Sequence, residues 1–157
     1  MMITLMLWEL GVIRAPHFYV SAFFEDCRDD YIELMRNVSE QQAWTEWVRF
    51  FLEALRAQAE RNIKTAEKIF ALYDDMKEQF RIELNSTWSV NALDFMFTNP
   101  VFRNNRFTKM SEIPSHVAMN LTRKLRDADL IREIAPASGR RPAMYAFEPL
   151  LEIVRKA

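Results

Sequence analysis

Two neighbouring arginines, Arg140 and Arg141, follow Gly139 in a stretch bounded by Pro136 and Pro142. Glycine and proline favour turns, so the two side chains, with Ser138 beside them, are expected at the tip of a loop. A guanidinium group presents a planar fork of donors that matches a phosphate, and a loop tip offers it no packing role. The spacing therefore predicts a contact with phosphate groups or with the minor groove of nucleic acid.

A second set of polar residues recurs at helical spacing between Ser115 and Ala128. Leu121 and Leu125 predict a buried face for this helix, which leaves the polar side chains outward. These are Ser115, His116, Asn120, Arg123 and Lys124, with Met119 and Asp127 also on the outward side. Arginine and lysine can bind phosphates or guanine edges, and asparagine can bind adenine through two hydrogen bonds. The alternative is an ordinary solvated helix face, with His116 serving only beside Ser115 at the start of the helix.

The surrounding sequence predicts the elements that hold these two groups. Ser89 is expected to cap a helix, Val90–Phe97, that ends at Asn99-Pro100, because proline disfavours α geometry in the residue before it. The further expected elements are a short helix at Thr108–Glu112, a turn at 113–115, the helix 115–128, strands at Leu130–Ile134 and Ala143–Phe147, and a last helix at Pro149–Val154. The two alternating apolar runs flank a loop with glycine and proline, as in a β-hairpin.

Helix, turn, helix and hairpin in this order are typical of a winged helix-turn-helix domain. Such a domain can place one helix in the major groove of double-stranded DNA and its hairpin against the neighbouring backbone. The same fold also mediates protein contacts and dimerisation, so the fold alone does not establish DNA binding.

The amino-terminal part is expected to be helical as well. Met2–Leu10 is an apolar run that Gly11 and Pro16 would end. A second helix, with Ser21 as its N-cap, is expected to reach Val38. Its predicted buried stripe consists of Phe23, Phe24, Cys27, Tyr31, Leu34, Met35 and Val38.

Between Trp44 and Leu84 the chain has neither proline nor glycine, and apolar residues recur at steps of three and four. One helix of that length would measure roughly 60 Å. We expect it either to break near Ile63 or to bury its stripe against a partner, with a homodimer through the helical part as the natural case.

The formal net charge of −1 conceals an uneven distribution. Residues 1–99 contain 10 Lys and Arg against 16 Asp and Glu, whereas residues 100–157 contain 11 against 6. A basic module on an acidic helical body fits a regulator that contacts nucleic acid, although a chance partition of surface charge is the alternative. The polar stretch 85–89 predicts the boundary, giving a helical part at 1–84 and a winged helix at 85–157. The predicted class is mainly α with one small β-hairpin.

Several kinds of chemistry are not expected. Gly11 and Gly139 are the only glycines and lie too far apart to form a phosphate-cradling loop, and Cys27 is the only cysteine, so neither a disulfide nor a zinc cluster is expected. His17 and His116 fall in different parts of the chain. The acidic pairs 29–30 and 74–75 are typical of solvated surface, and the aromatic residues from 44 to 51 of core. No signal or membrane segment is recognised, which predicts a cytoplasmic location. The residue types and their spacing predict neither a catalytic site nor a metal site.

Three stretches resemble the Fic family of protein adenylyltransferases. They are Pro16–Phe24, Arg28–Tyr31 and Trp44–Ala54, and they are similar to the part that follows that family's active-site loop. Members often continue through a long helix into a winged helix whose wing leads into a tyrosine-containing strand, as Gly139–Tyr145 does here. The resemblance covers nearly the whole chain.

The family's catalytic signature, His-Pro-Phe followed by Gly-Asn-Gly-Arg, has no match in this sequence. The resemblance would place it just before Met1, and so implies a non-catalytic, truncated carboxyl-terminal portion with a regulatory module and a missing catalytic half as partner. ATP, Mg²⁺ and AMP transfer to protein hydroxyls are implied only for a longer parent chain, and no catalytic residue is carried over.

Overall fold

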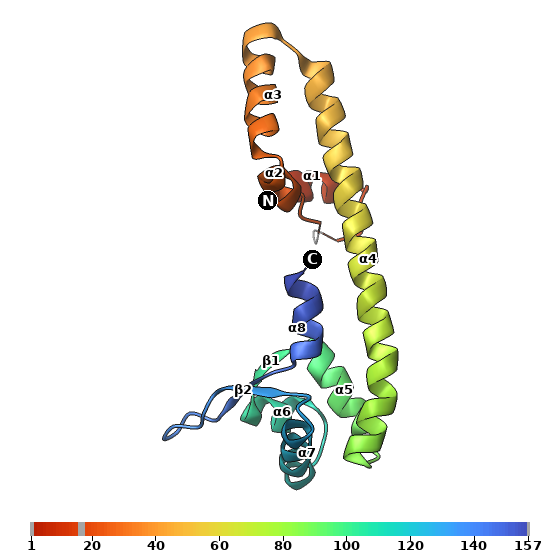
Figure 1. Ribbon diagram of the computed structural model, residues 1–157, viewed down its shortest axis with the longest axis vertical. Helices are drawn as coiled ribbons and strands as arrows, with labels where there is room; N and C mark the ends of the chain where they lie inside the picture. Colours follow the sequence, from red (N-terminus) through yellow and green to blue (C-terminus); the bar gives the residue numbers. More distant parts are fainter. Residues whose placement is uncertain (1, 16–17, 157) are drawn as a thin grey trace. The chain divides into compact units, whose positions relative to one another are not determined.

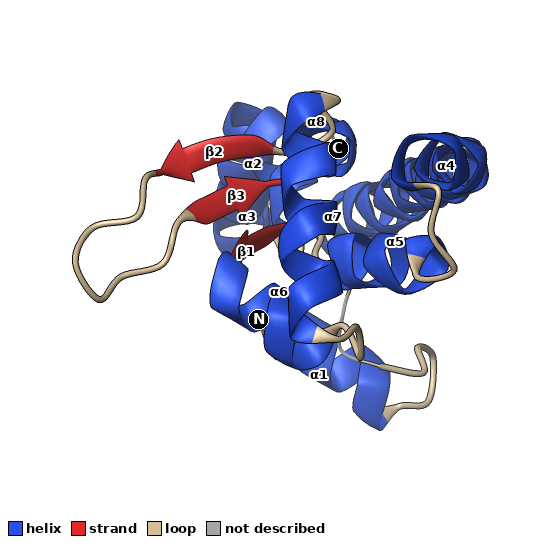
Figure 2. Cartoon of the chain, turned by 90° about the horizontal axis from the view of Figure 1, so that it is seen from below, coloured by secondary structure: helices blue, strands red, loops and turns tan. Residues whose placement is uncertain are grey.

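The computed structural model describes residues 2–15 and 18–156. The described chain is mainly helical, with a small three-stranded antiparallel sheet, as Figures 1 and 2 show. This confirms the fold class that the sequence predicts. Two compact units meet within one helix, between Lys64 and Thr65, ahead of the polar stretch 85–89.

The first unit consists of three helices and the start of a fourth. They are α1 (Met2–Glu9), α2 (Ser21–Asp26), α3 (Arg28–Gln41) and the first half of α4 (Trp44–Leu84). Gly11 has a φ of +69°, so the turn after α1 uses a left-handed conformation that glycine adopts without strain. Pro16, expected to stop this helix, lies outside the described residues, as does His17.

The prediction of a single helix from Ser21 to Val38 is wrong. The chain leaves α geometry at Cys27, whose φ and ψ are −114° and 39°, and α3 then continues to Gln41. Asp29 and Asp30 lie in the first turn of α3, where negative charge favours a new helix start. Ser21 is not an N-cap either, because Val20 occupies the cap position and Ser21 is the first helical residue.

Helix α4 is continuous over 41 residues, so the alternative of a break near Ile63 is wrong. No proline or glycine interrupts it, and every residue can therefore keep its backbone bond to the preceding turn. Its length is roughly 60 Å at 1.5 Å per residue. The second half of α4 belongs to the second unit, to which it contributes Phe80 and Leu84.

The second unit has the helix and strand order of a winged helix. Beyond α4 its elements are α5 (Ser89–Thr98), β1 (Val101–Arg103), α6 (Asn104–Met110), α7 (Ser115–Asp127), β2 (Arg132–Ala135), β3 (Met144–Ala146) and α8 (Glu148–Arg155). The sheet order is β1-β3-β2. Tyr145 of the central strand β3 pairs with Phe102 of β1 on one side and with Glu133 of β2 on the other. A register shift between Glu133 and Ala135 marks a β-bulge in the hairpin.

Three details of this unit differ from the sequence expectation. Strand β1 was not expected, because three residues after Pro100 are too few to show a period of two. It pairs with β3, and the helix expected at Thr108–Glu112 begins earlier, at Asn104. Ser89 does not cap α5, since Trp88 occupies the cap position without a side-chain bond and Ser89 is itself buried in the helix.

The core of the second unit joins α4 to the helices of the winged domain. Phe80 packs edge-on against Phe147, with ring centroids 6.1 Å apart, and Phe95 lies 5.0 Å from Phe107. The largest fully buried side chains are Phe80, Phe107, Phe147, Leu84, Leu93, Met96, Leu121 and Leu125. This core fixes α7 and the hairpin, which carry the candidate residues.

Candidate nucleic-acid interface

Helix α7 buries one face and exposes the other. Ala118, Leu121 and Leu125 are at most 2% exposed, because their spacing of three and four residues sets them on the side of the core. The opposite side carries the sequence-predicted residues Ser115, His116, Asn120 and Arg123, all exposed. The structure therefore brings four of the predicted α7 residues together on one exposed row.

Within this row, Asn120 and Arg123 are bound to each other. The Arg123 guanidinium donates from Nη2 to Asn120 Oδ1 over 2.9 Å. The bond holds both side chains along the helix surface, one turn apart. A bidentate contact of Asn120 with adenine needs the same Oδ1 as an acceptor, so Arg123 would have to share or release it. Arg123 keeps further N–H groups that can point toward phosphate or guanine.

Lys124 lies on a different side of α7. It is half-buried, and its Nζ donates to the backbone carbonyl of Leu84 over 2.6 Å. Leu84 is the last residue of α4, where carbonyl groups lack a partner within the helix and favour a positive charge. The structure thus gives Lys124 a role in anchoring α4 and places it apart from the exposed row.

The loop between β2 and β3 extends away from the sheet (Figure 2). The other predicted residues, Arg140 and Arg141, belong to this loop. Ser138 and Arg141 exchange two backbone hydrogen bonds, of 3.0 and 2.9 Å, and so close a two-residue turn. Gly139 begins this turn with a φ of +55°, which side chains other than glycine rarely adopt. Both arginines are exposed, so the turn chemistry presents two guanidiniums to solvent.

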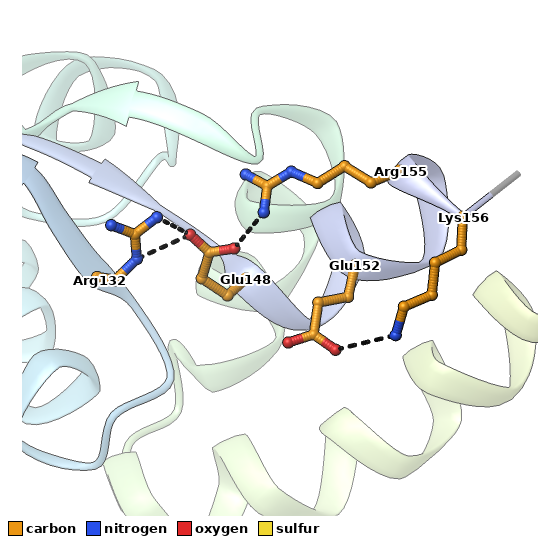
Figure 3. A network of polar contacts seen from close by, with 5 residues as sticks. All are labelled: Arg132, Glu148, Glu152, Arg155 and Lys156. Carbon is orange, nitrogen blue, oxygen red and sulfur yellow. Dashed lines mark hydrogen bonds and ion pairs between the residues drawn. The ribbon is translucent and has the colours of Figure 1, made fainter.

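The base of the hairpin is held from two sides. Arg103, at the end of β1, donates to the carbonyl of Pro142 over 3.0 Å. On the opposite edge of the sheet, Arg132 of β2 binds Glu148 of α8 with both Nε and Nη2, and Arg155 donates to the second carboxylate oxygen (Figure 3). Arg132 is the main cause that lowers the pKa of Glu148, with Arg155 adding to it. These contacts fix the direction in which the wing leaves the sheet.

Arg103 is a basic residue near the hairpin that no sequence pattern singles out. Arg106 and Lys109 on α6 are also exposed and basic, and Arg106 donates to the sulfur of Met110. None of the three was singled out, since strand β1 was not expected and the short helix was expected to begin only at Thr108. Arg126 is basic too, but it is paired with Asp127 next to it, so the two charges offset each other.

A hollow of about 240 Å³ lies beside the winged domain's first helix, α5. Its lining consists of Asn91, Asp94, Phe95, Thr98, Asn99, Met110, Ser111 and Glu112. Asp94 accepts a hydrogen bond of 2.5 Å from the Tyr73 hydroxyl. This bond, with burial and the charge of Asp94, raises the pKa of Tyr73 to about 12. Asp94 is therefore already bound to a side chain of α4.

No protein-family model matches the sequence. The arrangement of the winged domain and its exposed basic groups therefore carries the functional argument. Within residues 2–15 and 18–156, no group of three or more His, Cys, Asp or Glu side chains is placed to hold a metal ion. In the same described part of the chain, no helix is both long and apolar enough to cross a bilayer.

Proposed function

We propose that the winged helix binds double-stranded DNA, with α7 in the major groove and the hairpin tip on the neighbouring backbone or minor groove. The observation that carries the proposal is the pairing of one exposed polar row on α7 with two exposed arginines on a closed turn. Ser115, His116, Asn120 and Arg123 would face base edges and phosphates. Arg140 and Arg141 would bind phosphate or minor groove.

The charge distribution supports this orientation. Residues 100–157 hold the excess of basic side chains, whereas the half of α4 in the same unit carries five acidic residues, from Glu67 to Glu83, against the three basic residues Lys68, Lys77 and Arg81. Duplex DNA repels the acidic surface and attracts the basic one, so the two signs would orient the module during encounter. Lys124 is left out of the proposed contact, because its ammonium group already binds the end of α4.

The test is the salt dependence of binding to a labelled duplex, followed by fluorescence anisotropy. Each phosphate contact contributes about 0.9 to the slope of log affinity against log salt, so Arg140→Ala with Arg141→Ala should lower that slope by about 2. The matched control is Lys77→Ala with Arg81→Ala, which removes the same charge from the exposed surface of α4. Equal reductions in both double variants, or no binding at low salt, would contradict the proposal.

A second candidate function is contact with another protein through the winged helix. Met119 is 58% exposed in the middle of the α7 row and Met110 is 55% exposed at the end of α6. Flexible apolar side chains of this kind suit protein surfaces better than a phosphate backbone. Unchanged duplex mobility at low salt, together with binding to a protein that Met119→Glu abolishes, would favour this alternative.

We also propose kinship with the Fic family, as a non-catalytic part that carries its regulatory winged module in the cytoplasm. The described stretches that carry the resemblance pack together in the first unit. Phe24 lies 6.0 Å from Phe50 and Tyr31 lies 5.3 Å from Trp47, measured between ring centroids. AMP transfer, with ATP and Mg²⁺, would require the signature that this sequence lacks. Transfer of label from ATP to protein by this chain alone would contradict the non-catalytic assignment.

A further inference from the structure

Helix α4 carries a second apolar surface outside the core. Val48, Leu52, Ile63 and Phe70 are between 48% and 72% exposed. Successive residues of a helix are 100° apart around its axis, so these four side chains fall within a sector of about 80°. Three smaller or half-buried residues share this sector, which contains no charged residue. We call this surface the α4 stripe; it consists of Val48, Leu52, Leu55, Ala59, Ile63, Ala66 and Phe70. The buried side of the same helix, with Ala54 and Gln58, lies about 120° away.

The spacing of the α4 stripe is symmetric about Ala59. From the centre in either direction the steps are four, three and four residues. If a second copy of the helix runs antiparallel, Val48 therefore meets Phe70, Leu52 meets Ala66, and Leu55 meets Ile63. Ala59 meets its own copy, and its small side chain lets the two backbones approach. A two-fold interface requires this reciprocal match, in which each contact occurs twice.

The charges along one edge of the stripe have the same symmetry. Arg49 and Arg56 precede the centre and Glu60 and Glu67 follow it, all four exposed. In an antiparallel pair the same edges face each other, so Arg49 approaches Glu67 of the second copy and Arg56 approaches Glu60. A parallel pair would instead place these charges against the opposite edge of the stripe, where Phe51, Asn62 and Ile69 offer no charged partner. Within one chain, Arg56 and Glu60 make only a loose contact of 3.9 Å between highly exposed side chains.

We propose that two copies of this chain pair antiparallel through the α4 stripe, centred on Ala59. The occupant is a second copy because the apolar steps and the flanking charges are both self-complementary, which an unrelated partner would not require. From Val48 to Phe70 the stripe covers about three heptads, a length that can sustain a coiled-coil contact. The interface needs no DNA, so its failure would leave the proposed function of the winged helix untouched.

The first test is the mass of the full chain by light scattering and sedimentation equilibrium. The wild type should be a dimer, and Arg49→Glu or Glu67→Arg should each weaken it about tenfold, since two attractive pairs become repulsive. The double variant R49E/E67R should recover the wild-type affinity. A mixture of the two single variants should form a heterodimer. Lys64→Glu, on the far side of α4, is the matched control and should leave the affinity unchanged.

The second test fixes the direction of the two helices by cysteine cross-linking in a Cys27→Ser background. Ala59→Cys should form a disulfide-linked dimer, as should a mixture of Leu52→Cys and Ala66→Cys. Phe70→Cys alone should not, because its two copies would lie roughly 33 Å apart in an antiparallel pair. Cross-linking of Phe70→Cys with itself would overturn the antiparallel arrangement. A monomeric mass up to about 100 micromolar would overturn the dimer, since such weak pairing would not stabilise an exposed stripe.

Discussion

The two units use similar apolar residues in different ways. In the second unit, Phe80, Phe107 and Phe147 are completely buried, with Leu84 and Leu93 beside them. Among the described residues of the first unit, only Thr4, Val20, Ala54 and Gln58 are buried. Its aromatic rings, among them Trp47, contact one another but each keeps part of its surface in solvent. The winged helix has a core of its own, whereas the helical unit has a half-buried cluster.

This difference shows that aromatic residues in a sequence predict contacts between rings more reliably than they predict burial of those rings. The helices of the first unit do not enclose these rings, so part of each ring remains in solvent. The exposed apolar residues of the first unit include Trp8, Leu10 and Trp44, each at least 51% exposed. Apolar surface of this kind commonly marks a binding surface. Substitutions in the two units should therefore differ in their effects, and the largest difference is expected in stability.

The strongest test compares one phenylalanine from each unit. Phe107→Ala should destabilise the second unit by about 3–5 kcal/mol, because it opens a cavity in a fully packed core. Phe50→Ala should cost only about 1–2 kcal/mol, since the ring is already partly in solvent and packs chiefly against Phe23, Phe24 and Trp47. Chemical denaturation, followed by circular dichroism at one protein concentration, measures both. Equal destabilisation would remove the contrast between the units.

The next test concerns Lys124, which joins α7 to the end of α4. Lys124→Met should lower the stability of the second unit by about 1–2 kcal/mol, because the carbonyl of Leu84 loses its charged donor. Arg123→Met, its exposed neighbour, should change stability by less than about 0.5 kcal/mol. The order should reverse for DNA affinity, where Arg123 matters more. A larger reduction of DNA affinity in Lys124→Met would return that residue to the interface.

A third test uses the titration of Tyr73. Its pKa is raised to about 12 because its hydroxyl donates to Asp94, with burial adding to the effect. The folded state holds this proton more tightly than the unfolded state, so the stabilisation is complete below about pH 10 and is lost toward about pH 12. The difference in tyrosinate absorbance between wild type and Tyr73→Phe should therefore appear near pH 12. In Asp94→Asn the same transition should move to lower pH; an unchanged transition would exclude the hydrogen bond as its cause.

The smallest effect is expected at Glu148, whose pKa is lowered chiefly by Arg132. A lowered carboxyl pKa adds stability at neutral pH that disappears as the pH falls through the folded-state value. Wild type should thus be slightly more stable than Glu148→Gln at neutral pH, and the difference should vanish in acid. Denaturation curves at several pH values measure it. A difference that is constant with pH would point to packing instead of charge.

Long helices with many apolar repeats were predictable from the sequence, and very short elements were not. Helices α7 and α4 follow from many apolar residues at steps of three and four. Strand β1 has three residues, too few for any period, and only its pairing with β3 reveals it. The break at Cys27 was also hidden, because the apolar steps of α2 and α3 continue across it.

The candidate site was predicted more fully than the elements around it. Arg140 and Arg141 lie on an exposed turn because glycine supplies the left-handed residue that the turn needs. Lys124 could not be assigned from the sequence. Its position, one residue after Arg123, lies near the border of the buried face, and its partner Leu84 lies 40 residues earlier in the chain. Only tertiary packing distinguishes an anchoring lysine from one that faces solvent.

The bulge in β2 has a consequence for aggregation. The sheet order leaves β2 as an edge strand, with backbone groups to which another extended chain could otherwise add. The register shift between Glu133 and Ala135 twists that edge, and the exposed charges of Arg132 and Glu133 lie along it. Both features oppose the addition of another strand beside β2, even though Ile134 is partly exposed.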